Sequence, residues 1–261
     1  MRIGPVPTAL AASAYLSIKL HQRCRVMHDR GLWVHEFRDG VIVKTMIGGS
    51  SVRTLDRDTR HESLFQYVPK LGDTIVDVGA GIGEGVLTFS RLVGNTGRVI
   101  SIEAHPTTFA CLSEVVRRND LTNVVTLQAA VSGTDGSLDI SDMGGTSLSN
   151  TVMAGERGIK VRAITLDTLA AEYKITHVDF LKSNIEGAER LMIEGMTSLV
   201  SRVRNVSISC HDFIADRTAD DSFRTKELVR TFLVNHGFEV TEREDKLPEL
   251  SDTLYARRVA S

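Results

Sequence analysis

Hydrophobic and polar positions follow two different periods along the chain, and the change of period divides it into an extension and a main domain. Residues 31–48, GLWVHEFRDGVIVKTMIG, alternate apolar and polar side chains around the dipeptide Asp39-Gly40, a pattern typical of a β-hairpin and its turn. The apolar stretch 5–20 predicts a helix before this hairpin. We therefore expect residues 1–57 to form an N-terminal helix and hairpin, and residues 58–261 to form the main domain.

From residue 74 onward, short apolar runs alternate with amphipathic segments. The runs predict strands at 74–79, 97–104, 124–132, 177–184 and 203–212, and a closing antiparallel pair at 238–245 and 253–258. The segments predict helices at 83–94, 106–120, 165–173, 187–199 and 222–237, and a shorter helix precedes them at 59–72. The glycine- and serine-rich residues 137–166 predict a loop and hairpin. This order predicts an α/β fold with a mostly parallel sheet, whose ligands bind at the carboxyl ends of the strands.

Composition and charge exclude several classes of protein. The chain is 42% hydrophobic and 25% charged with a formal net charge of −2, which argues against a protein that binds a nucleic-acid backbone. Three cysteines lie far apart without a C-x-x-C pair, so the sequence favours a reducing cytoplasm over a disulfide framework. The stretch 5–20 is too short and too interrupted to span a bilayer. It packs on the body or on a second subunit in our interpretation, which leaves a homodimer and attachment to a membrane surface open.

A glycine-rich loop follows the first strand of the main domain. In VDVGAGIGEG (76–85), a dinucleotide-binding fingerprint would require its third glycine at position 84 or 86, where Glu84 and Val86 stand. The NAD-dependent oxidoreductase alternative is therefore disfavoured. The pattern D-x-G-x-G-x-G from Asp77 is similar to the first motif of class I S-adenosylmethionine-dependent methyltransferases, in which an acid suits a cationic ligand and would repel a pyrophosphate.

The next two strand ends complete a predicted cofactor site. Glu103 ends the second strand, where an acid accepts hydrogen bonds from ribose hydroxyls. Small residues at the end of the third strand leave room for an adenine. The predicted cofactor-binding residues are Asp77, Gly79, Ala80, Gly81, Gly83, Glu84, Glu103, Ala104, Ala130 and Val131.

Three segments together carry a resemblance to a known family. DVGAGIGE (77–84), IEAHP (102–106) and LKSNIEGAE (181–189) resemble the motifs of the FkbM-type methyltransferases over about residues 58–215. Gly81 and Asn184 replace an asparagine and an aspartate that are more frequent in the family. The resemblance implies a Rossmann-like class I methyltransferase fold, with a seven-stranded sheet, one antiparallel terminal strand and helices on both faces. It also implies O-methylation, since known members mostly methylate hydroxyl groups of sugars, polyketides and similar metabolites.

Polar residues at the fourth and fifth strand ends are the candidates for the acceptor side. The stretch SNIEGAE (183–189) contains no proline, and no cysteine directly follows a proline, so the motifs of nucleic-acid methyltransferases are missing. In one mechanism Glu186 or His211 is the general base. In the other, Glu186, His211 and Asp212 bind Mg²⁺, which lowers the pKa of the hydroxyl. The candidate catalytic residues are Lys182, Asn184, Glu186 and His211.

Three residues near this strand end, Lys182, Asn184 and Glu189, are predicted to pair, orient or stabilise rather than to transfer a proton. Lys182 is expected to pair with a carboxylate, and Asn184 can orient the acceptor but cannot act as a base. We interpret Glu189 as a residue that favours the first turn of the following helix through its dipole. Residues 141–158 predict an acceptor lid and 212–221 a second wall.

The sequence thus predicts a cytoplasmic S-adenosylmethionine-dependent O-methyltransferase with a small-molecule or oligosaccharide acceptor. A non-catalytic module that kept the fold and binds the cofactor remains a further alternative.

Overall fold

The computed structural model describes residues 4–141 and 158–259 and contains the predicted α/β fold. Its main sheet has seven strands in the order β12-β13-β11-β10-β4-β5-β6. Only β13 runs against its neighbours β11 and β12. The strands are β4 (Thr74–Val78), β5 (Arg98–Glu103), β6 (Val124–Gln128), β10 (Val178–Asn184), β11 (Val203–Ser209), β12 (Phe238–Thr241) and β13 (Thr253–Arg258). The predicted class I methyltransferase fold, with its antiparallel terminal strand, is confirmed.

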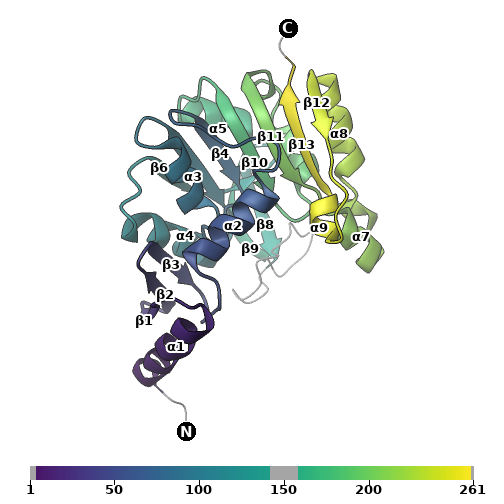
Figure 1. Cartoon of the computed structure of the whole chain (residues 1–261). Helices are drawn as coiled ribbons and strands as arrows, with labels where there is room; N and C mark the ends of the chain where they lie inside the picture. The colour runs from purple at the N-terminus through teal and green to yellow at the C-terminus, as the bar shows by residue number, and fades with distance from the viewer. Residues whose placement is uncertain (1–3, 142–157, 260–261) are drawn as a thin grey trace.

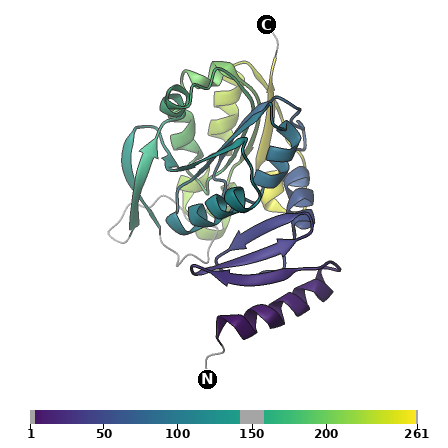
Figure 2. The same cartoon turned by 90° about the vertical axis from the view of Figure 1, so that its left-hand side faces the viewer.

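Helices cover both faces of this sheet (Figures 1 and 2). One apolar cluster holds residues from α5 (Leu166–Glu172), α6 (Glu189–Glu194) and α8 (Lys226–Asn235). The other holds residues from α3 (Val86–Val93) and α4 (Pro106–Arg118). The strand order reverses between β4 and β10, because β4 leads on to β5 on one side and β10 to β11 on the other. Ligands of open α/β sheets bind at such a switch point.

The third strand differs from its prediction. Residues 124–132 are expected to form one strand, but pairing with β5 ends at Gln128. Ala130–Val131 (β7) instead pairs with β9 (Gly158–Ile164), which also pairs with β8 (Gly136–Ser141). The chain therefore leaves the main sheet at Ala129 and starts a small second sheet, in which β8 and β9 form the expected hairpin.

The N-terminal extension contains one strand more than expected. Helix α1 (Pro5–Lys19) precedes an antiparallel sheet of β1 (Arg25–Asp29), β2 (Leu32–Phe37) and β3 (Gly40–Lys44). Its apolar residues share one cluster with α3 and α4, so the sheet packs directly on the main domain. No helix within residues 4–141 and 158–259 is long and apolar enough to cross a membrane.

Helix α2 (Val52–Glu62) lies earlier in the sequence than the helix predicted at 59–72. It begins at Ser51, whose hydroxyl accepts from the backbone N–H of Thr54 while the Thr54 hydroxyl accepts from that of Ser51. This reciprocal cap satisfies two backbone donors and starts the helix there. A domain boundary at residue 57 stays a prediction, and α2 runs across it.

Candidate functional site

A cavity of about 890 Å³ opens at the carboxyl ends of β4, β10 and β11. Its wall comes from the end of α2, the glycine loop after β4, the ends of β10 and β11, α7 (Asp212–Thr218) and α9 (Pro248–Ser251). Ligand pockets typically have 300–1,000 Å³, so the cavity is large enough for a ligand of that class. The predicted residues Lys182, Asn184, Glu186 and His211 all line it, together with Gly79, Ala80, Gly81, Glu84 and Glu103.

The glycine loop crosses directly over the end of β10. Gly79 has a φ of +69°, and a Cβ built on it would lie 2.0 Å from the backbone oxygen of Asn184. Only glycine fits both the left-handed backbone and this close approach. The amides of Gly79 and Ala80 donate to the carbonyl of Ile102 on β5. The loop is therefore fixed between two strand ends and presents its remaining surface to the cavity.

Glu103 holds the other side of the glycine loop. One carboxylate oxygen accepts from the Gly81 amide at 2.9 Å. The other accepts from the His105 amide at 2.9 Å and the Thr108 hydroxyl at 2.8 Å. Burial raises the pKa of Glu103, against these hydrogen bonds and the charge of Lys182, which lower it. The side chain lines the cavity from this fixed position, where we predicted a ribose-binding acid.

A second, smaller cavity of about 70 Å³ lies beside the first, and most of its lining residues are apolar or glycine. The two cavities share Gly79, Gly81, Glu103, Asn184 and Glu186. The predicted residues Ala104, Ala130 and Val131 line the small cavity, with Ile102 and Ala129 as further apolar neighbours. The small cavity suits the base of S-adenosylmethionine, and the large cavity suits its amino-acid end. Glu103, which lines both cavities, suits the ribose between them. The residues present therefore fit this cofactor.

Two of the predicted cofactor-binding residues, Asp77 and Gly83, do not line either cavity. Asp77 is buried and lines neither cavity. It forms an ion pair with Lys182 at 3.0 Å, and Lys182 also donates to the carbonyl of Gly79 at 2.8 Å. The acid holds Lys182, which ties β4 and β10 to the glycine loop, and a contact of Asp77 with a cationic ligand stays a prediction. Gly83 lines neither cavity and packs near Leu112.

Glu84 is the acid of the loop that faces the large cavity. Burial raises its pKa to about 6, while the charge of Lys182 lowers it and that of Glu103 raises it. A carboxyl group that titrates near neutrality in a cleft is a functional-site candidate. It would meet the amino-acid end of a bound cofactor or a polar group of the acceptor.

A histidine and two glutamates form a line across the wall of the large cavity. His211 Nδ1 lies 2.9 Å from Glu189 Oε1, and His211 Nε2 lies 3.7 Å from Glu186 Oε2. Glu189 is fully buried and also accepts from the hydroxyl of Thr225 at 2.9 Å. The contact with a carboxylate oxygen of Glu189 favours the tautomer with hydrogen on Nδ1, because that oxygen can accept from Nδ1–H. This tautomer leaves the Nε2 lone pair toward Glu186.

The pKa values of His211 and Glu186 are shifted by causes that oppose each other. Burial alone lowers the pKa of His211, but the hydrogen bond and charge of Glu189, together with the charge of Glu186, outweigh it and raise the pKa. Burial raises the pKa of Glu186, whereas the charge of His211 lowers it. Acid–base groups at functional sites are commonly perturbed in this way.

Glu189 is the functional residue that the sequence interpretation missed. We interpreted it as a dipole-stabilising residue on α6, but its carboxylate lies in the core against His211. The turn before α6 separates the two glutamates, since Glu186 and Gly187 both have positive φ values. A sequence signal existed: Glu189 shares helical spacing with Met192 and Ile193, which are buried, so an acid stood on the buried side of a helix.

The predicted metal ligands are not brought together. Glu186 and His211 line the large cavity, but Asp212 does not. Its carboxylate accepts from the amides of Thr225 and Lys226 at 2.9 and 3.0 Å. Within residues 4–141 and 158–259, no group of three or more His, Cys, Asp and Glu side chains is arranged to hold a metal ion. The donor set proposed for Mg²⁺ therefore does not fit.

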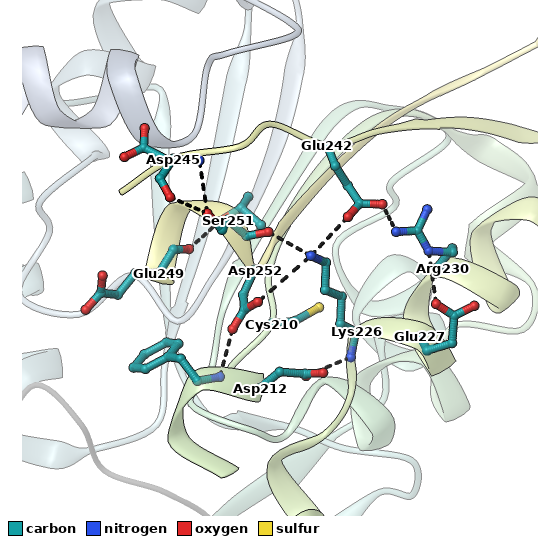
Figure 3. Close-up of polar contacts among 12 residues, drawn as sticks. Cys210, Asp212, Lys226, Glu227, Arg230, Glu242, Asp245, Glu249, Ser251 and Asp252 are labelled. Carbon is teal, nitrogen blue, oxygen red and sulfur yellow. Dashed lines mark hydrogen bonds and ion pairs between the residues drawn. The ribbon is translucent and has the colours of Figure 1, made fainter. Parts of the chain in front are cut away.

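Asp212 belongs instead to a polar network that fixes the outer wall of the cavity (Figure 3). The ammonium of Lys226 donates to the carbonyl of Ser251 at 2.7 Å and pairs with Glu242 at 3.0 Å. Asp252 accepts from the amide of Phe213 at 2.8 Å. These bonds join α7, α8 and α9, and so they position the cavity residues Phe213, Ile214, Arg217 and Thr218. The predicted wall at 212–221 does contribute to the cavity, whereas the predicted lid lies, except for its ends, outside the described residues.

Comparisons with known proteins agree with this fold. A sequence profile described as the Methyltransferase FkbM domain matches residues 77–240. No protein of curated function matches the sequence.

Solved structures with a similar fold include three methyltransferase-fold proteins. Methyltransferase FkbM from Methylobacillus flagellatus KT is 17% identical, over 71% of this chain and 43% of that one, with a TM-score of 0.48. This chain thus spans less than half of that protein. A putative rRNA-methylase from Clostridium thermocellum is 14% identical, over 82% and 99%, with a TM-score of 0.50. Aeropyrum pernix fibrillarin, solved with bound S-adenosyl-L-methionine, is 15% identical, over 90% and 99%, with a TM-score of 0.45.

Proposed function

The chain belongs to the FkbM methyltransferase family, and from that premise we propose that it methylates a hydroxyl group of a saccharide or related polyol. Methyl transfer that depends on S-adenosylmethionine is the general activity of this family and fold. The choice of oxygen as the acceptor and of a polyol as the substrate is our proposal.

The observation that carries the proposal is the line Glu189–His211–Glu186 at the wall of the large cavity. A sugar hydroxyl is a weak nucleophile until it begins to lose its proton, so its methylation needs a general base. His211 offers an Nε2 lone pair at the cavity, and a buried carboxylate orients the ring from behind. A base that is held by a third group is the usual arrangement for activating a hydroxyl.

Each residue would have a separate role in cofactor binding or proton transfer. S-adenosylmethionine, when bound, supplies an electrophilic methyl group on a positively charged sulfur. Gly79, Gly81 and Glu103 would hold its polar parts, and Ala130 and Val131 would contact its base. His211 Nε2 takes the proton of the acceptor hydroxyl while Glu189 keeps Nδ1 protonated. Glu186, 3.7 Å from Nε2, stabilises the imidazolium that results.

The lining of the cavity supports a polyol as the acceptor. Ser183, Ser207 and Ser209 line it from β10 and β11, and Glu62 and Glu249 add carboxylates. Polar side chains of this kind can pair with the hydroxyl groups of a polyol, whereas an apolar acceptor would leave them without partners.

The test is transfer of a labelled methyl group from S-adenosylmethionine to a panel of mono- and oligosaccharides. We expect label in an ether of a sugar hydroxyl, at least 10²-fold slower transfer by His211→Ala and Glu186→Gln, and cofactor affinity within about two-fold of the wild type by calorimetry. Transfer to nitrogen, carbon or nucleic acid instead would contradict the proposal. Lost cofactor affinity in both variants would place the two residues in cofactor binding rather than in proton transfer.

A further inference from the structure

Helix α1 has apolar side chains on both its inner and its outer side. No charged residue lies between Pro5 and Ile18, whereas a surface helix normally has one polar face. Its inner side, Ala9, Ala12 and Leu16, is buried against the N-terminal sheet. A helix that is apolar on both sides requires cover on its outer side as well.

The outer side of α1 has no such cover in the described chain. Its large apolar side chains are strongly exposed: Val6 by 70%, Leu10 by 69%, Tyr15 by 60% and Ile18 by 76%. At 100° per residue Leu10 and Ile18 lie on the side opposite to Ala9, Ala12 and Leu16, and Val6 and Tyr15 lie on the two flanks. Figures 1 and 2 show α1 at one end of the molecule, with the sheet β1–β3 between it and the main domain.

The helix is firmly docked, so this surface is a fixed feature. The hydroxyl of Ser13 accepts from the backbone N–H of Val26 at 2.8 Å, and that of Ser17 accepts from the backbone N–H of Cys24 at 2.9 Å. These bonds satisfy the backbone donor of Val26 on the edge strand β1 and that of Cys24 just before it. The exposed apolar side is therefore held in one orientation.

The charge around this side identifies what covers it. Residues 1–50, the part of the extension that holds α1 and the sheet β1–β3, contain seven Lys and Arg and three Asp and Glu. Residues 51–261 contain 24 and 30, so this part of the extension carries +4 and the rest of the chain −6. The three acids within residues 1–50 each pair with an arginine: Asp29 with Arg118, Glu36 with Arg25 at 3.5 Å, and Asp39 with Arg53 at 3.6 Å. Arg23 and Lys19 are exposed next to the helix. An apolar surface beside net positive charge is complementary to an anionic membrane.

We propose that α1 lies along the surface of a bilayer that contains anionic phospholipids. Leu10, Ile18 and their neighbours insert at the boundary of head groups and acyl chains, and Lys19 and Arg23 contact the phosphates. A second copy of the chain is the less suitable partner, because pairing the two helices would bring two extensions of charge +4 together. A nucleic acid would leave the apolar side uncovered. The helix has 15 residues, which suits a position along the membrane rather than across it.

The experiment is flotation of the full chain with vesicles of phosphatidylglycerol and phosphatidylcholine, compared with vesicles of phosphatidylcholine alone. We expect binding to the anionic vesicles only, weaker at 0.5 M salt. Leu10→Glu with Ile18→Glu should lower the bound fraction about ten-fold or more. Arg23→Gln should lower the partition coefficient about five-fold. Val234→Glu, which changes an apolar residue of similar exposure (55%) on α8, is the matched control and should bind like the wild type.

Two results would overturn the proposal. One is no binding to anionic vesicles by a folded wild type that binds S-adenosylmethionine. The other is a stable dimer in light scattering without lipid that Leu10→Glu with Ile18→Glu converts to a monomer, because the apolar side would then be a subunit interface. Thermal melts of each variant show whether it folds; all substituted side chains are exposed, so we expect melting points close to that of the wild type.

Discussion

Glu189 and His211 are joined by a 2.9 Å contact between Oε1 and Nδ1 in the core of the protein, 22 positions apart in the sequence. The contact links the start of α6 to the residue that precedes α7, and it places the free edge of the imidazole at the wall of the large cavity. A buried carboxylate with this position determines which nitrogen of the ring can accept a proton.

Replacing Glu189 by glutamine should therefore damage turnover more than binding. The amide keeps the shape but can present its NH₂ group to Nδ1, which would favour the wrong tautomer. We expect kcat to fall roughly 10²- to 10⁴-fold, with the Kd for S-adenosylmethionine within about two-fold. Single-turnover methyl transfer and calorimetry measure the two quantities. Glu227→Gln, at an exposed position on α8, is the control and should leave both unchanged. A variant with normal kcat would remove Glu189 from the mechanism.

The pH dependence of the reaction follows from the raised pKa of His211. A general base works only when unprotonated, so kcat/KM should rise with pH through the pKa of His211, at a pH above 6.5. Glu189→Gln removes the hydrogen bond and charge that raise this pKa, so the rise should move to lower pH. The comparison of pH–rate profiles, with NMR titration of the histidine ring protons as a second readout, checks this. A profile or titration that moves to higher pH in the variant would contradict it.

A chelator separates the two mechanisms that the sequence leaves open. Asp212 does not line the cavity, and one of its carboxylate oxygens accepts from the amides of Thr225 and Lys226, so it does not complete a magnesium site with Glu186 and His211 as they stand. We expect methyl transfer to continue at the same rate after dialysis against EDTA. Asp212→Asn should change thermal stability more than kcat. Activity that disappears with EDTA and returns with Mg²⁺ would show that the donor set forms on substrate binding and would revive the metal mechanism.

The part of the site that could be predicted from sequence is the part made of local patterns. The glycine loop and the acid at the end of β5 depend on backbone spacing within one β–α–β unit, and Gly79, Gly81 and Glu103 lie where expected. The alternation of strands and helices likewise predicted the fold class, since each pattern is read within a short window.

The remaining contacts depend on packing between distant segments. Asp77 was expected to face the cofactor, but Lys182 from the neighbouring strand pairs with it. Glu189 was expected to favour the first turn of its helix through the dipole, but its carboxylate also contacts His211 and Thr225. The short strand β1 was not predicted because its pairing with β2 and its cover by α1 are both tertiary effects. Sequence periodicity indicates which side of an element is buried, and it does not identify the partner.

The contact between Gly79 and β10 gives the sharpest test of the cofactor site. Alanine at position 79 would place a methyl group 2.0 Å from the carbonyl oxygen of Asn184 and would have to adopt a φ of +69°. Gly31→Ala is the matched control, because Gly31 has a φ of +84° but no heavy atom within 4 Å of the added Cβ. The backbone conformation alone costs about 1–2 kcal/mol, so Gly31→Ala should lower the free energy of unfolding by about that amount and leave cofactor affinity intact.

Gly79→Ala adds an overlap that backbone movement must relieve, so we expect the free energy of unfolding to fall by at least about 3 kcal/mol. Because this movement displaces the loop that lies between the two cavities, the affinity for S-adenosylmethionine should fall at least about ten-fold. Urea unfolding and calorimetry measure both effects, and equal losses of stability in the two variants would show that the loop does not rest on the end of β10.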